Sequence, residues 1–350
     1  MTQTTGGTVR IGLIGAGAVV RGFHLPALRA NPRVRVAVIA DPAPASRDLA
    51  AEIGADHASD PQAVFARADV DAVVIATPPH LTAPLTIQAV RAGKPSLSEK
   101  PLGKDVAEGR AAARASAETG RLVQLGFILR HGSAIRTARR WVDAGRIGTP
   151  VGFRYCVYNE PWLAGDPDHK GRLCGILAHS TAITTGGSHG VDLMSWFLPS
   201  PAVTVTALAA KTRPEYPGPN HWTALFQTAA GGWGEILVSW LHPMNAASAV
   251  PPYPAPRKPE IEIYGSEGCI FYDWQGGVLR LESHAAAECV TGFPPLELDF
   301  HAQLACFLDS LDAGRPLGPS AADGYRAVVL TESAERAWRE RRVVEVPGLE

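Results

Sequence analysis

The sequence predicts an α/β protein with two domains, the first built on a doubly wound parallel sheet and the second on a large, open, mostly antiparallel sheet. Its 350 residues are 46% hydrophobic and 19% charged, so the chain is long and apolar enough for about two well-buried cores. Before residue 150, short β-branched runs alternate with alanine-rich stretches of helical spacing. After it, strand-like runs follow one another with few helices between them.

The first domain, residues 1–130, is expected to alternate strictly between strands and helices. The expected strands are Val9–Ile14, Val34–Ile39, Val70–Ile75, Ser96–Ser98 and Leu122–Leu125. The expected helices are Leu25–Ala30, Ala45–Ile53, Pro61–Ala68, Leu81–Ala92 and Val106–Thr119. Because these strands are apolar without alternation, we expect a parallel sheet covered by helices on both faces, with right-handed crossovers.

The second domain, residues 131–350, is expected to hold most of its strands without intervening helices. Expected strands are Val151–Tyr158, Val203–Ala210, Trp222–Thr228, Gly234–Trp240, Glu260–Tyr264, Cys269–Trp274 and Val278–Leu281. Expected helices are Gly187–Phe197, Phe300–Asp312 and Ala321–Glu340, the last returning toward the first domain. Glycine and proline turns separate many of these strands, which favours antiparallel pairing. The proline-rich segment Pro251–Pro256 is expected to be an extended loop.

Charge and cysteine usage exclude several functional classes. With 33 basic and 34 acidic residues the chain has no basic field for nucleic acid and no polybasic run for a membrane surface. Five widely spaced cysteines without a C-x-x-C pair indicate reduced thiols in a cytoplasmic protein. We find no signal peptide, no membrane span and no histidine spacing typical of a metal site, so no bound metal is expected.

A glycine-rich turn follows the first expected strand directly. Gly15 permits the tight turn and Gly17 lets backbone N–H groups approach a pyrophosphate, although Val20 stands where a third glycine is usual. Asp41 ends the second expected strand, where a carboxylate can accept hydrogen bonds from the adenosine ribose and would repel a 2′-phosphate. A turn or capping role for Asp41 is the alternative. The pattern favours NAD over NADP, with Arg47 nearby as the opposing signal.

Several further segments carry a family resemblance. Thr77-Pro-Pro-His80 follows the third expected strand, and Ser98-Glu-Lys-Pro-Leu102 follows the fourth. Together with the glycine turn, with Gly186-Gly-Ser-His189 and with Ser320-Ala-Ala-Asp323, they resemble the Gfo/Idh/MocA oxidoreductases over nearly the whole chain. That family includes glucose–fructose oxidoreductase, inositol dehydrogenase and proteins of rhizopine catabolism.

The resemblance implies a fold, a reaction and a set of partners. The fold is a Rossmann domain followed by an α/β domain whose open sheet often forms an oligomer interface, so a homodimer or homotetramer is expected. The reaction is hydride transfer between a nicotinamide cofactor and a carbinol or keto carbon of a sugar, amino sugar or cyclitol. The residues expected to bind NAD are Gly15, Gly17, Ala18, Val19, Asp41, Thr77, Pro78, His80, Glu99 and Lys100.

Lys100 and His189 are the expected catalytic residues. Lys100 lies at a strand end, where a doubly wound sheet binds ligand, and an ammonium there can stabilise charge on the reacting oxygen. A surface lysine paired with Glu99 is the alternative. His189 is the candidate general acid/base, because imidazole titrates near neutrality, although a buried structural histidine is also compatible. Asp192, one helical turn on, could orient its ring or be a structural acid.

The chain departs from the family pattern at three positions. Family members often carry an aspartate four residues before the histidine, and this chain has Thr185. Thr82 and Ile128 replace residues that are usually polar or histidine. A hydroxyl cannot act as a carboxylate base, so two alternatives stay open. One is a glycosidase or lyase that uses NAD without net redox, and the other is a cofactor-binding protein with impaired catalysis.

Further substrate contacts are expected from charged, aromatic and polar residues. Arg130 could hold a polar or anionic group, with a structural salt bridge as the equal alternative. Tyr158, Asn159 and Trp162 leave a strand in a loop, where sugar stacking and hydroxyl contacts are as compatible as core packing. Thr185 and Asp192 complete the expected substrate-binding set.

Overall fold

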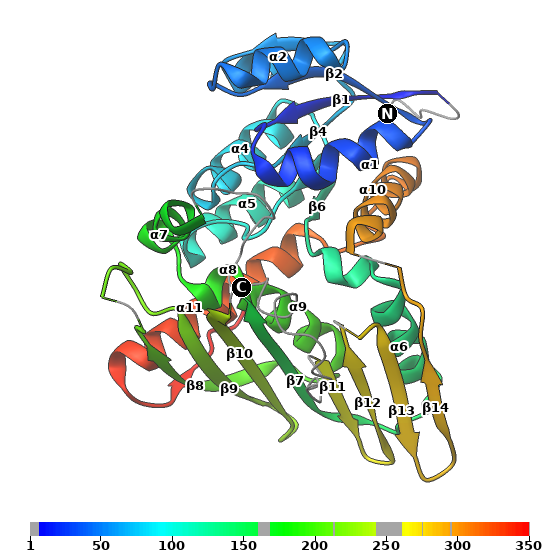
Figure 1. The fold of residues 1–350 in the computed structure, drawn as a ribbon, viewed down its shortest axis with the longest axis vertical. Helices are drawn as coiled ribbons and strands as arrows, with labels where there is room; N and C mark the ends of the chain where they lie inside the picture. Colours follow the sequence, from blue (N-terminus) through cyan, green and yellow to red (C-terminus); the bar gives the residue numbers. More distant parts are fainter. Residues whose placement is uncertain are drawn as a thin grey trace, which may run out of the picture. The chain divides into compact units, whose positions relative to one another are not determined.

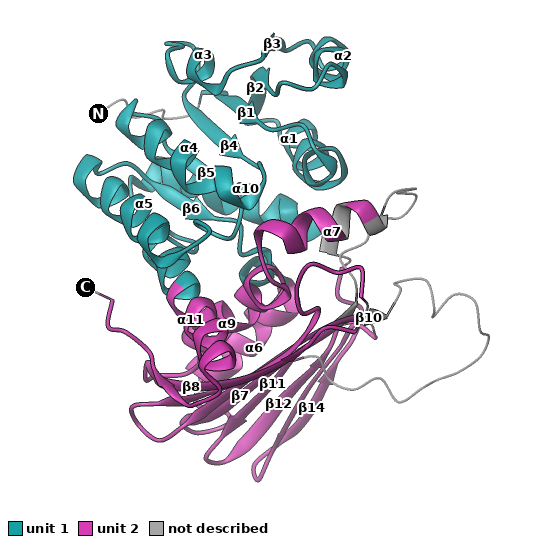
Figure 2. Ribbon diagram, turned by 90° about the vertical axis from the view of Figure 1, so that its left-hand side faces the viewer, with its two compact units in different colours: residues 1–132, 295–328 teal, residues 133–294, 329–350 magenta. Residues whose placement is uncertain are grey.

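The computed structural model describes residues 7–159, 169–212, 214–242, 261–274, 276–294 and 296–349. The chain forms two compact units (Figure 2). Unit 1 comprises residues 1–132 and 295–328, and unit 2 comprises residues 133–294 and 329–350. The segment 295–328 therefore packs with residues from which it is far removed in sequence. Helix α11 (Ala321–Glu340) begins in unit 1 and ends in unit 2.

Unit 1 contains a six-stranded sheet in the order β3-β2-β1-β4-β5-β6. All of its neighbouring strands pair in parallel. The strands are β1 (Val9–Ile14), β2 (Val34–Ala40), β3 (Asp56–Ala58), β4 (Ala72–Ile75), β5 (Ser96–Ser98) and β6 (Val123–Leu125). Strand β4 is buried throughout, as an apolar strand covered on both faces should be. The predicted doubly wound fold is confirmed, with β3 as a short edge strand that the sequence prediction missed.

Helices cover both faces of this sheet (Figure 1). Helices α4 and α5 pack together on one face, and α1 and α10 pack together on the other. Their bounds, with the remaining helices of unit 1, are η1 (Val20–His24), α1 (Leu25–Ala30), α2 (Ala45–Glu52), α3 (Pro61–Phe65), α4 (Pro79–Arg91), α5 (Val106–Thr119), η2 (Ile128–His131) and α10 (Leu296–Ala313). Helix η1 is a π-helix, a short turn wound more loosely than an α-helix, and the sequence did not predict it.

Unit 2 contains a nine-stranded sheet in the order β14-β13-β12-β11-β7-β10-β9-β8-β15. Every pair is antiparallel except β7 with β10, so the predicted mostly antiparallel sheet is confirmed with one parallel pair at its centre. The strands are β7 (Pro150–Asn159), β8 (Ala202–Ala210), β9 (His221–Thr228), β10 (Trp233–His242), β11 (Ile261–Gly265), β12 (Gly268–Asp273), β13 (Val278–Ser283), β14 (Ala287–Val290) and β15 (Val344–Glu345). Pro251–Pro256 lies outside the described residues.

Helices of unit 2 pack on one face of its sheet. Figure 2 shows α6 and α9 on that face, and α9 contacts β7 and β10. The helices are α6 (Ser133–Asp143), α7 (His169–His179), α8 (Ala182–Thr185) and α9 (Gly187–Phe197). On the opposite face, Leu208 and Leu225 are 73% and 49% exposed, whereas Val205 and Phe226 on the helix side are buried. This unit therefore has one apolar covered face and one face with exposed leucines.

Candidate active site

The predicted cofactor residues of unit 1 lie at one edge of its sheet. Gly15 directly follows β1, Asp41 follows β2, and Thr77 comes two residues after β4. Glu99 and Lys100 follow β5. Because all six strands are parallel, their carboxyl ends meet at the same edge, and the strand order reverses between β1 and β4. Dinucleotides bind at this position in doubly wound sheets.

The two glycines of the turn differ in how closely other atoms pack against them. Gly15 has φ +95°, and a Cβ there would lie 2.3 Å from the carbonyl oxygen of Ala76. Its N–H donates to Ala40 O at 2.9 Å, which extends the pairing of β1 and β2 into the turn. A Cβ on Gly17 would meet nothing within 4 Å. The turn is thus pressed against β4 on one side and open at Gly17, as a backbone that receives a pyrophosphate requires.

Asp41 is bound to the same turn. Its Oδ2 accepts a hydrogen bond from the N–H of Ala16 at 2.8 Å, and its Oδ1 accepts one from the N–H of Ala43 at 2.8 Å. Arg21 also holds the turn, because its Nε donates a hydrogen bond to Ala16 O at 3.0 Å. A carboxylate oxygen has further acceptor capacity, so this fixed carboxylate is suited to the hydroxyls of an adenosine ribose.

The turn after β4 presents a buried hydroxyl. The Oγ1 atom of Thr77 is buried with no hydrogen-bond partner among the described residues. Buried hydroxyls are almost always hydrogen-bonded in complete structures, so a ligand oxygen at this edge is a fitting partner. Pro78 and His80, at the start of α4, are exposed. The open Gly17, the fixed Asp41 and the buried Thr77 hydroxyl together fit a dinucleotide.

Glu99 and Lys100 lie beside this edge in a buried environment. The N–H of Glu99 donates to Ile75 O at 2.8 Å, which anchors the segment to β4. Glu99 Oε1 lies 2.8 Å from Nε2 of His24, and its Oε2 accepts a hydrogen bond from the backbone N–H of Lys100 at 3.3 Å. Burial lowers the pKa of Lys100 below that of an ordinary lysine, and the charge of Glu99 opposes this shift.

Arg130 pairs with an acid of the same unit. Its Nη2 lies 3.3 Å from Oδ1 of Asp323, and its side chain is 11% exposed. Arg326 reaches the same oxygen at 2.9 Å, and Ser320 donates to the other carboxylate oxygen. Burial raises the pKa of Asp323, but the two arginines and the Ser320 hydrogen bonds outweigh it, so the pKa lies below its usual value.

His189 of unit 2 is placed by a close helix–strand contact. It lies near the start of α9 and is half-buried, and Asp192 on the next turn is 3% exposed. A Cβ on Gly190 would lie 2.5 Å from Cδ1 of Tyr155, so only glycine lets α9 approach β7 this closely. The histidine and the aspartate are therefore held on a rigid, closely packed helix.

Helix α8, which carries Thr185, is anchored by an acid from far along the chain. Glu335 Oε1 accepts hydrogen bonds from the hydroxyls of Thr181 at 2.6 Å and Thr184 at 2.7 Å. The Oγ1 of Thr185 itself lies 3.1 Å from Oγ of Ser180. The sequence did not reveal Glu335, because its partners lie about 150 residues away.

The side chains of three predicted substrate residues lie outside the part of the chain that the structure describes. Tyr158 and Asn159 end strand β7, and their side chains lie outside the described residues, as does all of Trp162. Across the described segments, no group of three or more histidine, cysteine, aspartate or glutamate residues could hold a metal ion. No described helix is long and apolar enough to span a membrane.

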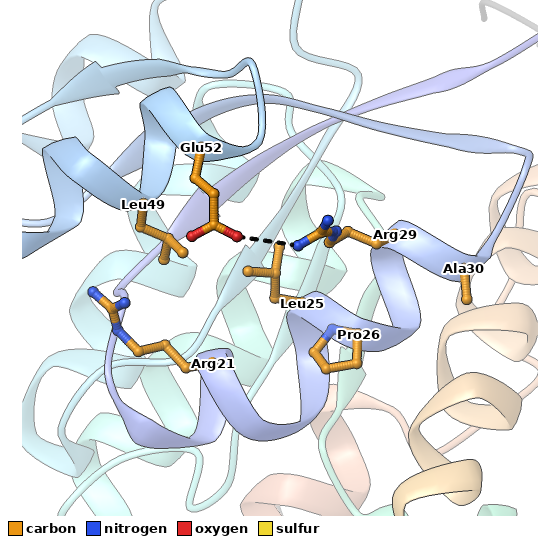
Figure 3. Close-up of a pocket in the computed structure, with 7 residues that line it drawn as sticks. All are labelled: Arg21, Leu25, Pro26, Arg29, Ala30, Leu49 and Glu52. Atoms are coloured by element: carbon orange, nitrogen blue, oxygen red, sulfur yellow. Dashed lines mark hydrogen bonds and ion pairs between the residues drawn. The ribbon is translucent and has the colours of Figure 1, made fainter.

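A surface pocket of about 600 Å³ lies between α1 and α2 (Figure 3). An ion pair between Arg29 and Glu52 crosses it at 3.4 Å. Its lining comprises Arg21, Leu25, Pro26, Arg29, Ala30, Leu49 and Glu52. None of the predicted site residues lines it, so it is a different feature from the strand-end site.

Comparison with known proteins identifies the family. Residues 9–127 match the model described as "Oxidoreductase family, NAD-binding Rossmann fold", and residues 135–271 match the GFO/IDH/MocA C-terminal domain. Inositol 2-dehydrogenase 1 of Saccharopolyspora erythraea is 30% identical, with 97% of this chain and 96% of the relative covered. Inositol 2-dehydrogenase of Rhizobium meliloti is 29% identical, with 97% and 99% covered.

Solved structures show the same fold. Levoglucosan dehydrogenase in complex with NADH and levoglucosan superposes with a TM-score of 0.85 at 21% identity, covering 97% of this chain and 100% of that one. The scyllo-inositol dehydrogenase of Lactobacillus casei gives a TM-score of 0.78 at 21% identity, with 99% of both chains covered. With the full-length similarity to its relatives, this chain belongs to the Gfo/Idh/MocA family and is an oxidoreductase that uses NAD in its Rossmann domain.

Proposed function

We propose that the chain is a dehydrogenase that transfers a hydride between NAD and a carbinol or keto carbon of a sugar, amino sugar or cyclitol. One structural observation carries the proposal: a half-buried lysine, whose pKa is lowered by desolvation, follows β5 at the sheet edge that bears the glycine turn. Relatives named as inositol 2-dehydrogenases align with the chain from end to end. A protein of the same fold is described in complex with NADH and levoglucosan.

The cofactor would be held by the residues at the strand ends. Backbone N–H groups of Gly17, Ala18 and Val19 would bind the pyrophosphate, and Asp41 would accept hydrogen bonds from the adenosine ribose. Thr77, Pro78, His80, Glu99 and Lys100 are the further proposed cofactor contacts. When bound, NAD supplies the acceptor or donor of the hydride.

The proton chemistry falls to two side chains. As the hydride leaves the carbinol carbon, the hydroxyl proton must be taken up, and the imidazole of His189 is the proposed acceptor. The ammonium of Lys100 is the proposed hydrogen-bond donor that would stabilise negative charge developing on the substrate. Asp192 orients the His189 ring, and Thr185 offers a hydroxyl for a substrate hydroxyl. Arg130, Tyr158, Asn159 and Trp162 remain proposed substrate contacts.

A substrate panel with matched lysine variants tests the proposal. NADH formation is measured with myo-inositol, scyllo-inositol, levoglucosan and aldoses, and the reverse reaction with the corresponding ketones. Lys100→Met should lower kcat by about 100- to 1000-fold while NAD still binds. Lys104→Met, which removes an exposed lysine paired with Glu108, should leave kcat unchanged. Equal activity of the Lys100 and Lys104 variants would contradict the proposal.

Thr185 favours a second candidate, a chain that binds NAD without productive dehydrogenation. Its hydroxyl lies beside Ser180 and cannot serve as a carboxylate base. This candidate predicts tight NAD binding and no turnover over the whole panel. The variant Thr185→Asp, which supplies the carboxylate that relatives often carry, would then create activity.

We also propose that the uncovered sheet face of unit 2 joins copies of the chain. Leu208 on β8 and Leu225 on β9 lie on this face, and contiguous exposed apolar surface marks interaction sites. Light scattering after size exclusion should give a homodimer or homotetramer. Leu225→Glu should shift the distribution to smaller species, whereas Val343→Glu, at an exposed position outside the sheet, should not.

A further inference from the structure

A buried histidine contacts the acid next to Lys100. His24 is 4% exposed, and its Nε2 lies 2.8 Å from Glu99 Oε1. The two residues are 75 positions apart in sequence, so the contact is made by the fold and not by a local turn. A buried pair of this kind is costly to form unless its hydrogen bonds are well made. The buried contact between His24 and Glu99 therefore needs a functional or structural explanation.

The backbone and two phenylalanine rings hold the histidine in place. His24 ends the π-helix η1, and such turns alter the direction of the side chains that follow. Its ring meets the ring of Phe300 edge-on at 5.1 Å, and Phe300 stacks on Phe23 at 4.8 Å. Because Phe300 comes from α10, the histidine is held between two separate segments of unit 1.

Glu99 is equally constrained. Its Oε1 is taken by His24 and its Oε2 accepts from the backbone N–H of Lys100. A Cβ on Gly126 would lie 2.8 Å from the Glu99 carboxylate, so the absence of a side chain there makes the space for it. The negative charge of Glu99 acts on the Lys100 ammonium against the cost of burial. Asp299 and His301 are the titratable residues adjacent to Phe300 in α10.

We propose that His24 is a positioning residue that holds the Glu99 carboxylate in place, so that its charge sustains the proton on Lys100. The inference rests on the proposed function only in the catalytic role given to Lys100. Without His24, the Glu99 carboxylate loses the partner that holds its Oε1 atom. The carboxylate can then move away from Lys100. The ammonium then loses electrostatic support, and its proton is released at lower pH.

Titration of Lys100 tests this directly in the full-length protein, with and without NAD. The chain has six lysines, so ¹³C-labelled lysine gives a readable spectrum in which Lys100→Arg identifies the Lys100 signal. The Lys100 midpoint should fall by about one pH unit in His24→Leu and at least as far in Glu99→Gln. His24→Gln, which retains an N–H donor, should restore it. His301→Leu, a histidine removed from α10, should not change it.

A double variant distinguishes an effect of His24 that acts through Glu99 from a general destabilisation of the fold. If His24 acts through Glu99, the His24→Leu/Glu99→Gln protein should show the same Lys100 midpoint as Glu99→Gln alone. An unchanged or raised midpoint in folded His24→Leu overturns the inference. Where His24→Leu does not fold, a normal midpoint in Glu99→Gln overturns it instead. Activity in Lys100→Met would refute the proposed function and leave the titration result standing, so the two failures are distinct.

Discussion

The two units differ in how the sequence specifies their site residues. In unit 1 each predicted residue follows a strand by one to five positions, so the parallel sheet brings them to one edge. In unit 2 the site helices are placed by contacts between distant segments, such as Thr181 with Glu335. Local motifs therefore indicate the proposed cofactor residues of unit 1, whereas the proposed substrate residues of unit 2 depend on packing that no short motif predicts.

Replacement of Gly15 should produce the largest effect, because a single turn determines the cofactor site. In Gly15→Ala the added carbon meets the carbonyl oxygen of Ala76 at a backbone angle of +95°, and positive-φ strain alone costs about 1–3 kcal/mol. Because the turn must shift to relieve this contact, we expect NAD affinity to fall by about 100-fold, which corresponds to about 3 kcal/mol. Titration calorimetry measures the affinity, and thermal unfolding reports the strain.

Two other glycines of the same region provide matched controls. Gly17→Ala has open space for its Cβ, so its melting temperature should be unchanged while NAD affinity falls through contact with the cofactor. Gly22→Ala in the π-helix also has open space and should change neither property. If all three variants bound NAD equally well, the glycine turn would not be the pyrophosphate site.

His189→Asn tests the substrate side of the same contrast. Asparagine keeps the size and polarity of the side chain but cannot take up a proton near neutral pH, so kcat should fall by about 100-fold or more with little change in KM. The acidic arm of the kcat profile should also disappear. His284→Asn, an exposed histidine of unit 2, is the control. Retention of the acidic arm would assign the proton transfer to another group.

The strand runs and motifs of unit 1 predicted its sheet because local periodicity and turn chemistry agree there. The π-helix η1 was missed, because Val20–His24 has no signal that distinguishes it from an ordinary helix start. In unit 2, α6, α7 and α8 were missed. Helix α7 follows a segment rich in proline and glycine, and four-residue α8 is held by hydrogen bonds to Glu335. Periodicity cannot detect an element held by one distant side chain.

The ion pair of Asp323 with Arg130 shows that unit 1 also contains contacts between residues far apart in the sequence. The pKa of Asp323 lies below the usual value in the folded protein, so this carboxylate contributes stability above the unfolded pKa that is lost as the pH falls through the folded one. Asp323→Asn should therefore cost about 2 kcal/mol at neutral pH, and the difference from wild type should shrink below about pH 4. Urea unfolding at several pH values measures it.

The exposed ion pair between Arg33 and Asp312 serves as the control for the urea-unfolding measurement on Asp323→Asn. Asp312 is 45% exposed, and exposed ion pairs contribute about 0–1 kcal/mol. Asp312→Asn should therefore change the free energy of unfolding by less than about 0.5 kcal/mol at any of these pH values. Equal effects of the two variants would mean that the Arg130–Asp323 pair adds no more than a surface contact.

Glu335→Gln tests the long-range anchor of unit 2 and should have a smaller effect than Asp323→Asn. Glutamine keeps one acceptor oxygen for the hydroxyls of Thr181 and Thr184 but loses the charge that strengthens both bonds, so unfolding should become easier by about 1 kcal/mol. Glu340→Gln, on the same helix and paired with Arg342, should differ little from wild type. Hydrogen exchange then distinguishes a local anchor from a global one. Faster exchange confined to α8 indicates that Glu335 holds only the helix that carries Thr185, whereas uniformly faster exchange across unit 2 would show that it supports the whole unit.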